Sequence, residues 1–208
     1  MIRVYHFLSA EHAVDNIRRR RIKIATFDTL NDPFELWAVA QPDKNVRAGL
    51  RKWKKTMSRR YGVLCFCRSW HSTLLWSHYA DKHRGMALGF DVRDDLIRQM
   101  DYVKHRPMFT KVSDAMAEKL LFTKFADWQY EQEWRICTRL EDRDPETRLF
   151  FADFNKDLVL REVIAGPLCE TSKVTIERAL RKHDRVSVVK GRLAFKSFRV
   201  IKNNRGFR

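Results

Sequence analysis

Hydrophobic and polar residues alternate from Ile2 to Leu8 with a period of two, which is the period of side chains along a β-strand. Ser9 follows, a residue type preferred at the start of a helix, and apolar residues three and four positions apart continue that helix to about Arg19. A second strand is expected over 22–27. The chain therefore opens with a predicted strand, helix and strand.

The same two periods recur through the rest of the chain. Further helices are expected where apolar residues recur three or four positions apart, over 43–60, 74–80, 115–125 and 172–182. Further strands are expected at alternating or continuous apolar runs, over 62–67, 85–92, 102–105, 131–140, 158–165, 186–190 and 194–201. Pro33 indicates a turn over 30–35, and 141–148 has the composition of a charged loop.

The order of these elements predicts the fold class. Strands and helices do not alternate regularly enough for a doubly wound parallel sheet, so we expect an α+β fold. No repeat, low-complexity linker or glycine-serine spacer divides the chain, and 208 residues lie within the range of one domain. We expect a single domain over 1–208, with the sequence motifs in a core over 1–140 and a basic C-terminal part over 171–208.

Composition indicates a globular protein. Hydrophobic residues make up 44% of the chain, including 14 Phe and 6 Trp, which is enough for a sizeable core without disulfides or a structural metal. No apolar run is long enough to span a bilayer, and the first residues are too interrupted for a signal-peptide core, so we expect a cytoplasmic protein that does not enter a membrane. The four cysteines lack the spacing of a zinc site and are expected to be reduced.

The formal net charge of +16 predicts an anionic partner. Basic residues are concentrated in 18–21, in 44–60 and in 171–208, where twelve Lys or Arg accompany two acids. Such patches neutralise phosphates, so we favour nucleic acid as the partner. Two alternatives stay open: the charge serves solubility, or an acidic protein partner, such as an inhibitor or antitoxin, neutralises it.

The most informative pattern is the segment Tyr130–Arg135. A strand would place Glu131 and Glu133 on one face, within a frame of aromatic and basic side chains. Two adjacent carboxylates repel each other, so such a pair commonly binds cations, accepts hydroxyl protons or stabilises a developing positive charge. The structural alternative is a solvated strand edge with two exposed glutamates.

Four other clusters combine polar and aromatic residues, and each has a structural alternative. They are Tyr5 with His6, the turn Asn31–Glu35, Ser69–His71, and Trp76–Asp81 in a predicted helix. Asn-Asp-Pro is often only a turn closed by side-chain hydrogen bonds. An aromatic pair three positions apart on a helix more often packs in the core than binds a ligand.

Taken in order, three motifs resemble those of a bacterial family long described only as a domain of unknown function. The motifs are Asn31-Asp32-Pro33-Phe34-Glu35 (NDPFE), Trp76-Ser77-His78-Tyr79-Ala80-Asp81 (WSHYAD) followed by His83-Arg84-Gly85, and Tyr130-Glu131-Gln132-Glu133-Trp134-Arg135 (YEQEWR). The strand Val63-Leu64-Cys65-Phe66 belongs to the same likeness, which spans residues 1 to about 140. Membership of that family by itself implies no activity.

A more distant resemblance has mechanistic content. The opening strand with His6, the strand ending at Cys67 with Ser69, the aromatic Tyr79 and the pair Glu131 and Glu133 are similar in order to the motifs of the ADP-ribosyltransferase superfamily. The resemblance implies a split β-sheet core with flanking helices and NAD as a substrate. Cys67 departs from the pattern, because a Ser or Thr is common at that position.

The resemblance also implies a division of catalytic labour. Breaking the bond between nicotinamide and ribose passes through an oxocarbenium-like ribosyl group, which carboxylates stabilise in glycosidases. Glu133 would therefore hydrogen-bond the ribose 2′-hydroxyl and favour that cation. Glu131 would orient or deprotonate the acceptor nucleophile.

The residues implied to bind NAD lie earlier in the chain. His6 would donate to a ribose hydroxyl, Ser69 would belong to the superfamily's Ser or Tyr motif on its second strand, and Tyr79 would stack on the nicotinamide ring. Arg84 or Arg135 would contact the pyrophosphate, since a guanidinium binds phosphate oxygens in pairs. No glycine-rich phosphate loop is present, so we do not expect NAD to bind as in a Rossmann fold.

Three functions follow as hypotheses. The first is an NAD-dependent ADP-ribosyltransferase that modifies a nucleic acid, with RNA favoured over DNA, in the role of a toxin or antiphage defence effector. The second is a metal-dependent nuclease with Asp32, Glu35, Glu131 and Glu133 around Mg²⁺. The third is a noncatalytic nucleic-acid-binding module in which these clusters only pack. On the first hypothesis, Glu133→Gln is expected to abolish nicotinamide release with little change in the thermal unfolding temperature.

Overall fold

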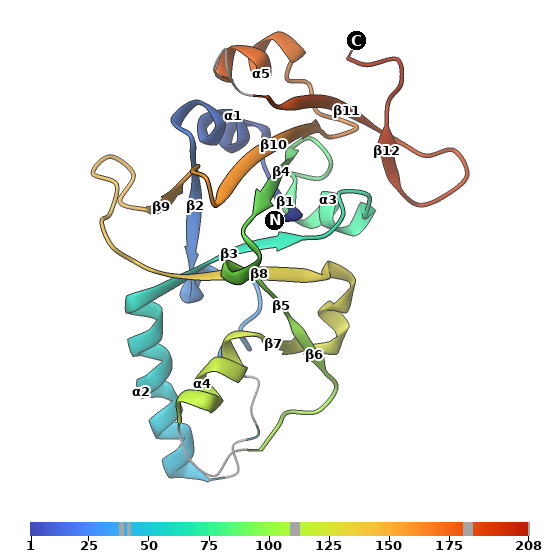
Figure 1. Ribbon diagram of the computed structural model, residues 1–208. Helices are drawn as coiled ribbons and strands as arrows, with labels where there is room; N and C mark the ends of the chain where they lie inside the picture. Colours follow the sequence, from blue (N-terminus) through green and yellow to red (C-terminus); the bar gives the residue numbers. More distant parts are fainter. Residues whose placement is uncertain (38–39, 41–42, 109–112, 181–184, 208) are drawn as a thin grey trace. The chain divides into compact units, whose positions relative to one another are not determined.

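A computed structural model describes residues 1–37, 40, 43–108, 113–180 and 185–207 (Figure 1). The fold is mixed α+β, with mostly antiparallel strands and flanking helices, as the order of elements predicts. The helices are α1 Ala10–Arg19, α2 Lys44–Arg60, α3 Thr73–Tyr79, α4 Asp114–Leu121 and α5 Lys173–Ala179, with 3-10 helices η1 Phe27–Thr29, η2 Asp94–Leu96 and η3 Ala126–Glu131. The strands are β1 Ile2–Leu8, β2 Arg21–Thr26, β3 Tyr61–Cys67, β4 Met86–Val92, β5 Arg98–Gln99, β6 Asp101–Val103, β7 Thr123–Phe125, β8 Glu133–Arg139, β9 Phe150–Asp153, β10 Leu158–Ala165, β11 Ser187–Leu193 and β12 Val200–Lys202.

These elements form two compact units, each built from separate segments of the chain. The first unit comprises Met1–Ile22, Phe66–Asp94 and Ala152–Arg208, and the second comprises Lys23–Cys65 and Asp95–Phe151. The expectation of one domain over 1–208 stays a prediction, and so does the finer assignment to an ADP-ribosyltransferase-like split sheet.

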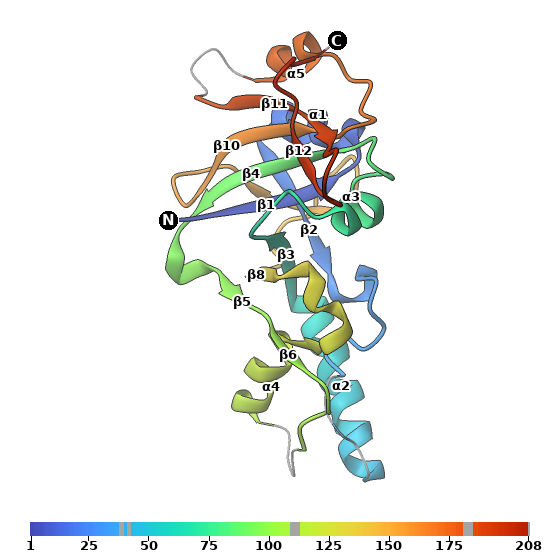
Figure 2. The ribbon, with the colours of Figure 1, turned by 90° about the vertical axis from the view of Figure 1, so that its right-hand side faces the viewer.

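The sheet of the first unit has the strand order β12-β11-β10-β4-β1, of which Figure 2 shows β11, β10, β4 and β1 side by side. The neighbouring strands are antiparallel except for β10 and β11, which run parallel and are connected through α5. In the register of β1 and β4, Tyr5 lies opposite Gly89, and a Cβ at Gly89 would come within 2.9 Å of the Tyr5 ring. Because Gly89 has no side chain, the Tyr5 ring has room beside it. The Tyr5 hydroxyl donates a hydrogen bond to Glu162, at 2.9 Å.

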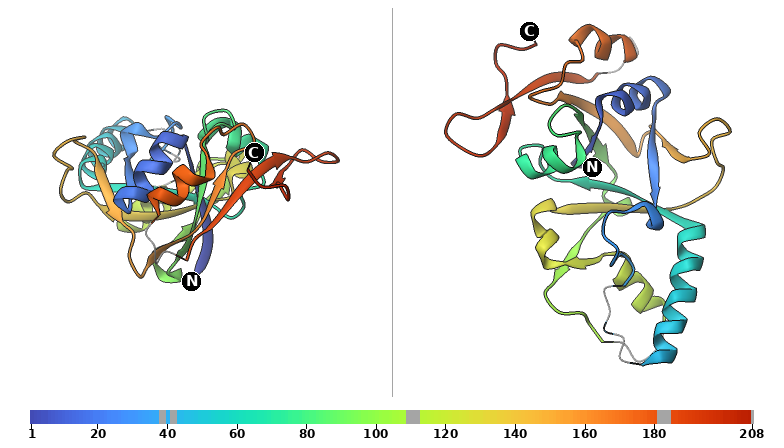
Figure 3. Two further views of the ribbon diagram at one scale, coloured as in Figure 1. Left: turned by 90° about the horizontal axis from the view of Figure 1, so that it is seen from above. Right: turned by 180° about the vertical axis from the view of Figure 1, so that it is seen from behind.

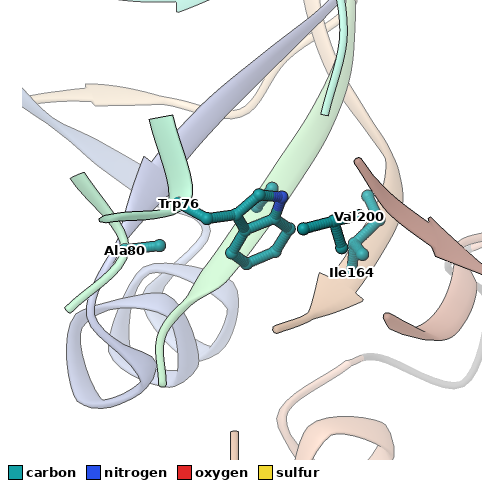
Figure 4. Packing of buried hydrophobic residues seen from close by; sticks show 5 residues of the cluster. Trp76, Ala80, Ile164 and Val200 are labelled. Atoms are coloured by element: carbon teal, nitrogen blue, oxygen red, sulfur yellow. The ribbon is translucent and has the colours of Figure 1, made fainter. Parts of the chain in front are cut away.

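The core of the first unit lies between this sheet and its helices. The Ser9 side chain accepts from the backbone N–H of His12 and starts α1, which packs beside α5 (Figure 3). Trp76 of α3 is fully buried against a cluster that contains Ile164 and Val200 (Figure 4). Trp76 of the WSHYAD motif is therefore a core residue of the first unit, as the structural alternative for the aromatic residues of this helix predicts.

The second unit is built around β3 and β8. β2 and β8 pair with β3, β5 pairs with β8, and β6 and β7 form a separate parallel pair. The helix α2 begins at Asp43, whose side chain accepts from two backbone N–H groups. Leu50 of α2 packs with Met116 and Leu120 of α4, so the predicted amphipathic helix buries its apolar face as expected.

Several predicted boundaries are wrong in the second unit. The predicted helix over 115–125 ends at Leu121, and Thr123–Phe125 forms a strand instead, because it pairs with β6. The predicted strand over 131–140 begins only at Glu133, because Gln132 adopts a left-handed conformation with φ of 45° and Ala126–Glu131 is a 3-10 helix. Strand β9 was not predicted, and it lies next to the charged loop.

In the first unit two C-terminal elements are shorter than predicted, whereas the strand expected over 186–190 continues to Leu193. The helix expected over 172–182 ends at Ala179, and residues 181–182 lie outside the described part of the chain. The strand expected over 194–201 is confined to Val200–Lys202, because residues 194–199 form a hairpin loop.

Two further expectations concern the whole chain. In the described ranges, no helix is both long and apolar enough to cross a membrane. None of the four cysteines, all of which the structure describes, forms a disulfide.

Candidate functional site

The glutamate pair of the YEQEWR motif lies in a buried network of charged side chains in the second unit. Glu133 opens β8 and Glu131 closes η3, and the left-handed turn at Gln132 between them brings both carboxylates to Lys124 of β7. The Lys124 ammonium donates to Glu131 Oε2 and, at 3.0 Å, to Glu133 Oε2. The two carboxylates therefore meet at Lys124, but the prediction that one strand places both on the same face is wrong, because Glu131 ends a 3-10 helix and only Glu133 is in β8. Both side chains are buried.

Arg135 connects this pair to the NDPFE motif. Its side chain is 1% exposed and points to the same side of β8 as Glu133, two residues earlier. The guanidinium donates to both oxygens of Glu133 and to both oxygens of Glu35, with Arg135 Nη1 at 2.8 Å from Glu35 Oε2. A guanidinium that binds two carboxylates in this way is held in one orientation.

The NDPFE turn positions Glu35 for this contact. Asp32 Oδ1 accepts from the backbone N–H of Phe34 at 2.9 Å, and the Asp32 carbonyl accepts from the N–H of Glu35 at 3.1 Å. Asp32 is buried, so its carboxylate shapes the turn rather than facing solvent. The structure therefore brings the NDPFE and YEQEWR motifs together, although about 100 residues separate them.

Two neighbours complete the surroundings of Glu133. The Tyr102 hydroxyl of β6 accepts from the Glu133 backbone N–H at 2.8 Å, and burial raises the pKa of that hydroxyl to about 12. Burial together with the charge of Glu133 raises the pKa of the Cys65 thiol well above its ordinary value. Both groups are therefore neutral at physiological pH.

The electrostatics keep Glu133 ionised. Burial alone would raise its pKa, but the charges of Arg135 and Lys124 outweigh burial and lower it to about 2. Burial likewise opposes the charge of Lys124, but Glu133 and Glu131 raise the pKa of its ammonium above the ordinary value. Glu35, Glu131 and Glu133 thus share two cations, so the buried network contains one more acid than base.

A pocket of about 220 Å³ lies beside this network and is also contained in the second unit. Lys124 lines the pocket and is at the same time bound to both glutamates. Phe34 and Phe125 provide aromatic walls, and the Arg106 guanidinium lies 4.6 Å from the centre of the Phe34 ring. Lys104 adds a further cation to the lining and Asp32 adds an acid, so the pocket combines aromatic faces with an excess of positive charge.

The four residues predicted to bind NAD all lie in the first unit. His6 is half-buried in β1 with its ring 5.9 Å from that of Phe66, and Ser69 Oγ accepts from a backbone N–H in the loop before α3. Tyr79 is half-buried at the end of α3 with its ring 6.1 Å from that of His78, and Arg84 is exposed. Glu131 and Glu133 lie in the second unit, so convergence of the two sets stays a prediction.

The loop that carries Arg84 has an unusual backbone. Asp81, Lys82 and His83 adopt left-handed conformations in succession, with φ of 44°, 51° and 71°. Such a run is unfavourable for residues with a Cβ. Gly85 closes the loop, because a Cβ there would lie 2.1 Å from the carbonyl oxygen of Leu8. His83 and Gly85 of the His-Arg-Gly segment therefore shape this loop, whereas Arg84 is the residue with a proposed binding role.

Sequence reasoning missed Lys124 and Tyr102. Lys124 falls in a predicted helix, where a single lysine does not indicate a site. In the structure it lies in β7, which pairs with β6, and its ammonium binds the glutamates. A signal was present in the sequence, because Lys124 stands between Phe122, Thr123 and Phe125 in an otherwise apolar setting. A lone charge in such a run is buried only when it has a partner.

Neither a metal site among the described residues nor a similar known protein indicates the function of this chain. Among the residues that the structure describes, no group of three or more His, Cys, Asp or Glu side chains is arranged to hold a metal ion. No family model, curated protein or solved structure matches this chain. The functional argument therefore depends on the residues of the site.

Proposed function

We propose that the chain is an NAD-dependent ADP-ribosyltransferase that modifies a nucleic acid, RNA in preference to DNA, and acts as a toxin or antiphage defence effector. One observation carries the proposal: Glu133 is held ionised in a buried site, beside a pocket with aromatic walls and basic groups. The order of His6, Ser69, Tyr79 and the glutamate pair, which resembles that of the superfamily, supports it.

The chemistry uses both glutamates. The bond between ribose C1′ and the nicotinamide nitrogen breaks, nicotinamide leaves with the bonding electrons, and the positive ribosyl group forms next to the Glu133 carboxylate. The acceptor hydroxyl or ring nitrogen then bonds to C1′, and Glu131 takes its proton. His6, Ser69, Tyr79 and Arg84 bind NAD in this proposal, with the roles that the superfamily resemblance implies.

Lys124 controls access to the carboxylates. Both oxygens of Glu133 are bound, one by Arg135 and the other by Arg135 and Lys124. Because Lys124 also lines the pocket, a ribose bound there lies next to Lys124. The proposal therefore requires Lys124 to release Glu133 Oε2 to the ribose 2′-hydroxyl when NAD binds.

The size and lining of the pocket limit what it holds. Its volume of about 220 Å³ lies below the roughly 300–1,000 Å³ of typical ligand pockets, so it takes one ring system rather than a whole dinucleotide. Phe34 and Phe125 suit the face of a planar ring, and Lys104 and Arg106 suit a phosphate. The pocket therefore fits one half of NAD.

A second candidate is a noncatalytic nucleic-acid-binding module. The observation that favours it is that each carboxylate of the network already pairs with a lysine or arginine, as in a purely structural ionic cluster. The net charge of +16 serves nucleic-acid binding equally well. This candidate predicts no consumption of NAD.

The test is release of nicotinamide from NAD by the purified chain, in the presence of RNA, DNA or no acceptor. Glu133→Gln is compared with Glu118→Gln, which removes an exposed carboxylate of the same unit that forms an ion pair with the exposed Arg98. The proposal predicts that wild type and Glu118→Gln release nicotinamide and that Glu133→Gln, compared at equal folded protein, does not.

Two other outcomes would assign a different function. Nucleic-acid cleavage that needs no NAD and stops on chelation of divalent cations would support the nuclease hypothesis. Salt-sensitive nucleic-acid binding without NAD consumption, equal in wild type and Glu133→Gln, would support the binding module.

A further inference from the structure

The hairpin of β11 and β12 presents two aromatic side chains to solvent at the edge of the first unit. Its loop, residues 194–199, extends beyond the sheet in Figures 1 and 3. Phe195 is 92% exposed and Phe198 is 95% exposed. Large apolar side chains are rarely left so open without a binding role when they occur together.

The backbone of this hairpin is held in place, so the exposure is a property of an ordered element. Ala194 N–H donates to the Arg199 carbonyl at 2.9 Å, and the Thr73 hydroxyl donates to the Phe198 carbonyl at 3.1 Å. At its base, Val200 is fully buried in the Trp76 cluster shown in Figure 4. The two phenylalanines are thus displayed on a pre-organised support, which lowers the entropic cost of binding.

Positive charge surrounds the aromatic side chains. The Arg192 guanidinium lies 4.6 Å from the centre of the Phe195 ring, and Lys196 stands between the two phenylalanines in the sequence. Residues 185–208 contain eight Lys or Arg and no Asp or Glu. An aromatic pair in this setting complements a ligand that has both flat apolar faces and negative charge.

A groove of about 880 Å³ leads away from Phe195 within the same unit. Arg192, Asn203, Asn204 and Arg205 are among its lining residues, and Glu170 is the acid among them. The Asn203 amide closes the turn to Gly206, so Asn204 is the residue whose amide can donate and accept hydrogen bonds, as base edges do. The groove therefore combines an apolar lining, which includes Leu168, Leu193 and Phe207, with basic and amide groups.

We propose that this hairpin and groove form a binding site for single-stranded nucleic acid. Bases stack on Phe195 and Phe198, and the backbone phosphates contact Arg192, Lys196 and Arg205. A single strand fits better than a duplex, because only unpaired bases expose their faces for stacking. It also fits better than a membrane surface, because Arg192, Arg205 and Asn204 line the groove beside the aromatic pair and a lipid chain has no group for them to bind. The inference concerns binding and does not depend on NAD chemistry.

The experiment measures fluorescence anisotropy of a labelled 12-nucleotide oligo(U), and of a 12-base-pair duplex, at several salt concentrations without NAD. The proposal predicts that the double variant F195A/F198A weakens oligo(U) binding by at least about tenfold, since each base stacked on an aromatic side chain contributes roughly fivefold or more. F195W/F198W should retain binding, because tryptophan provides a larger stacking surface. Val174→Ala, which shortens another exposed apolar residue of the same unit, is the matched control and should leave affinity unchanged.

Salt dependence separates stacking from charge. F195A/F198A should leave the slope of affinity against salt unchanged, whereas Lys196→Gln should reduce it, because phosphate contacts set that slope. Because both phenylalanines are exposed, the circular dichroism of F195A/F198A should match that of wild type.

Three outcomes would overturn the proposal. They are equal oligo(U) affinity of wild type and F195A/F198A, preference for the duplex, or loss of binding to phosphatidylserine vesicles in F195A/F198A with no change toward oligo(U). Failure here would leave the NAD proposal intact, because nicotinamide release is measured separately.

Discussion

Replacing Glu133 by Gln removes one of three carboxylates that share two buried cations, so its effect on stability follows from the network itself. In the variant, Lys124 still binds Glu131 and Arg135 still binds Glu35. The network loses its excess negative charge, and each cation keeps one carboxylate. We therefore expect Glu133→Gln to weaken the fold without abolishing it.

The magnitude follows from the pKa of Glu133. That pKa is about 2 in the folded chain and about 4.3 in an unfolded one, so ionised Glu133 stabilises the fold by about 3 kcal/mol relative to its neutral form. Glutamine resembles the neutral form, and the variant should lose about that amount at pH 7, equivalent to a fall in Tm of about 6–12 °C. This replaces the expectation, drawn from the sequence alone, of an almost unchanged unfolding temperature.

The assay is urea unfolding of both proteins, followed by tryptophan fluorescence, from pH 7 down to pH 3. Because the folded pKa is lowered, the stabilisation is complete above the unfolded pKa and is lost as the pH falls toward 2. The difference between wild type and Glu133→Gln should therefore hold from pH 7 to about 5 and shrink to about half near pH 3. A difference that is absent at pH 7, or that does not change with pH, would refute the description of Glu133 as a buried ionised group.

Three substitutions test other parts of the structure. Arg135→Met leaves Glu35 and Glu133 without their shared guanidinium and should cost about 3–5 kcal/mol in urea unfolding, whereas an effect below about 1 kcal/mol would contradict the buried network. Trp76→Ala should cost about 3–5 kcal/mol by the same measurement, because it empties the centre of the first unit, and a neutral effect would contradict that packing. Gly85→Ala places a Cβ 2.1 Å from a backbone carbonyl of β1 and should lower the Tm in a thermal melt, and an unchanged Tm would contradict the close approach.

Local patterns predicted the elements well where hydrophobic period and capping agree. The strand Ile2–Leu8, the Ser9 cap and the long basic helix α2 were identified from the sequence with nearly correct bounds. Strand β9 and the short strand β7 were missed, because strands of three or four residues carry too little periodicity to be recognised without their partners.

The candidate site could be predicted in part. The sequence identified Glu131 and Glu133 as a pair, but for a reason that the structure does not bear out: they were expected on one face of a strand, whereas the left-handed turn at Gln132 brings them together. It could not identify Lys124, whose contact with them depends on the pairing of β7 with β6. Nor could it show that the NDPFE turn delivers Glu35 to Arg135, because that contact joins residues far apart in the chain.

The central claim is that Glu133 takes part in transfer of ADP-ribose from NAD to a nucleic acid. The most direct measurement is the mass of an RNA oligonucleotide after incubation with NAD and the purified chain. The proposal predicts that wild type and Glu118→Gln add ADP-ribose to the RNA and that folded Glu133→Gln adds none. RNA of unchanged mass with wild type, or equal modification by folded Glu133→Gln, would contradict the claim.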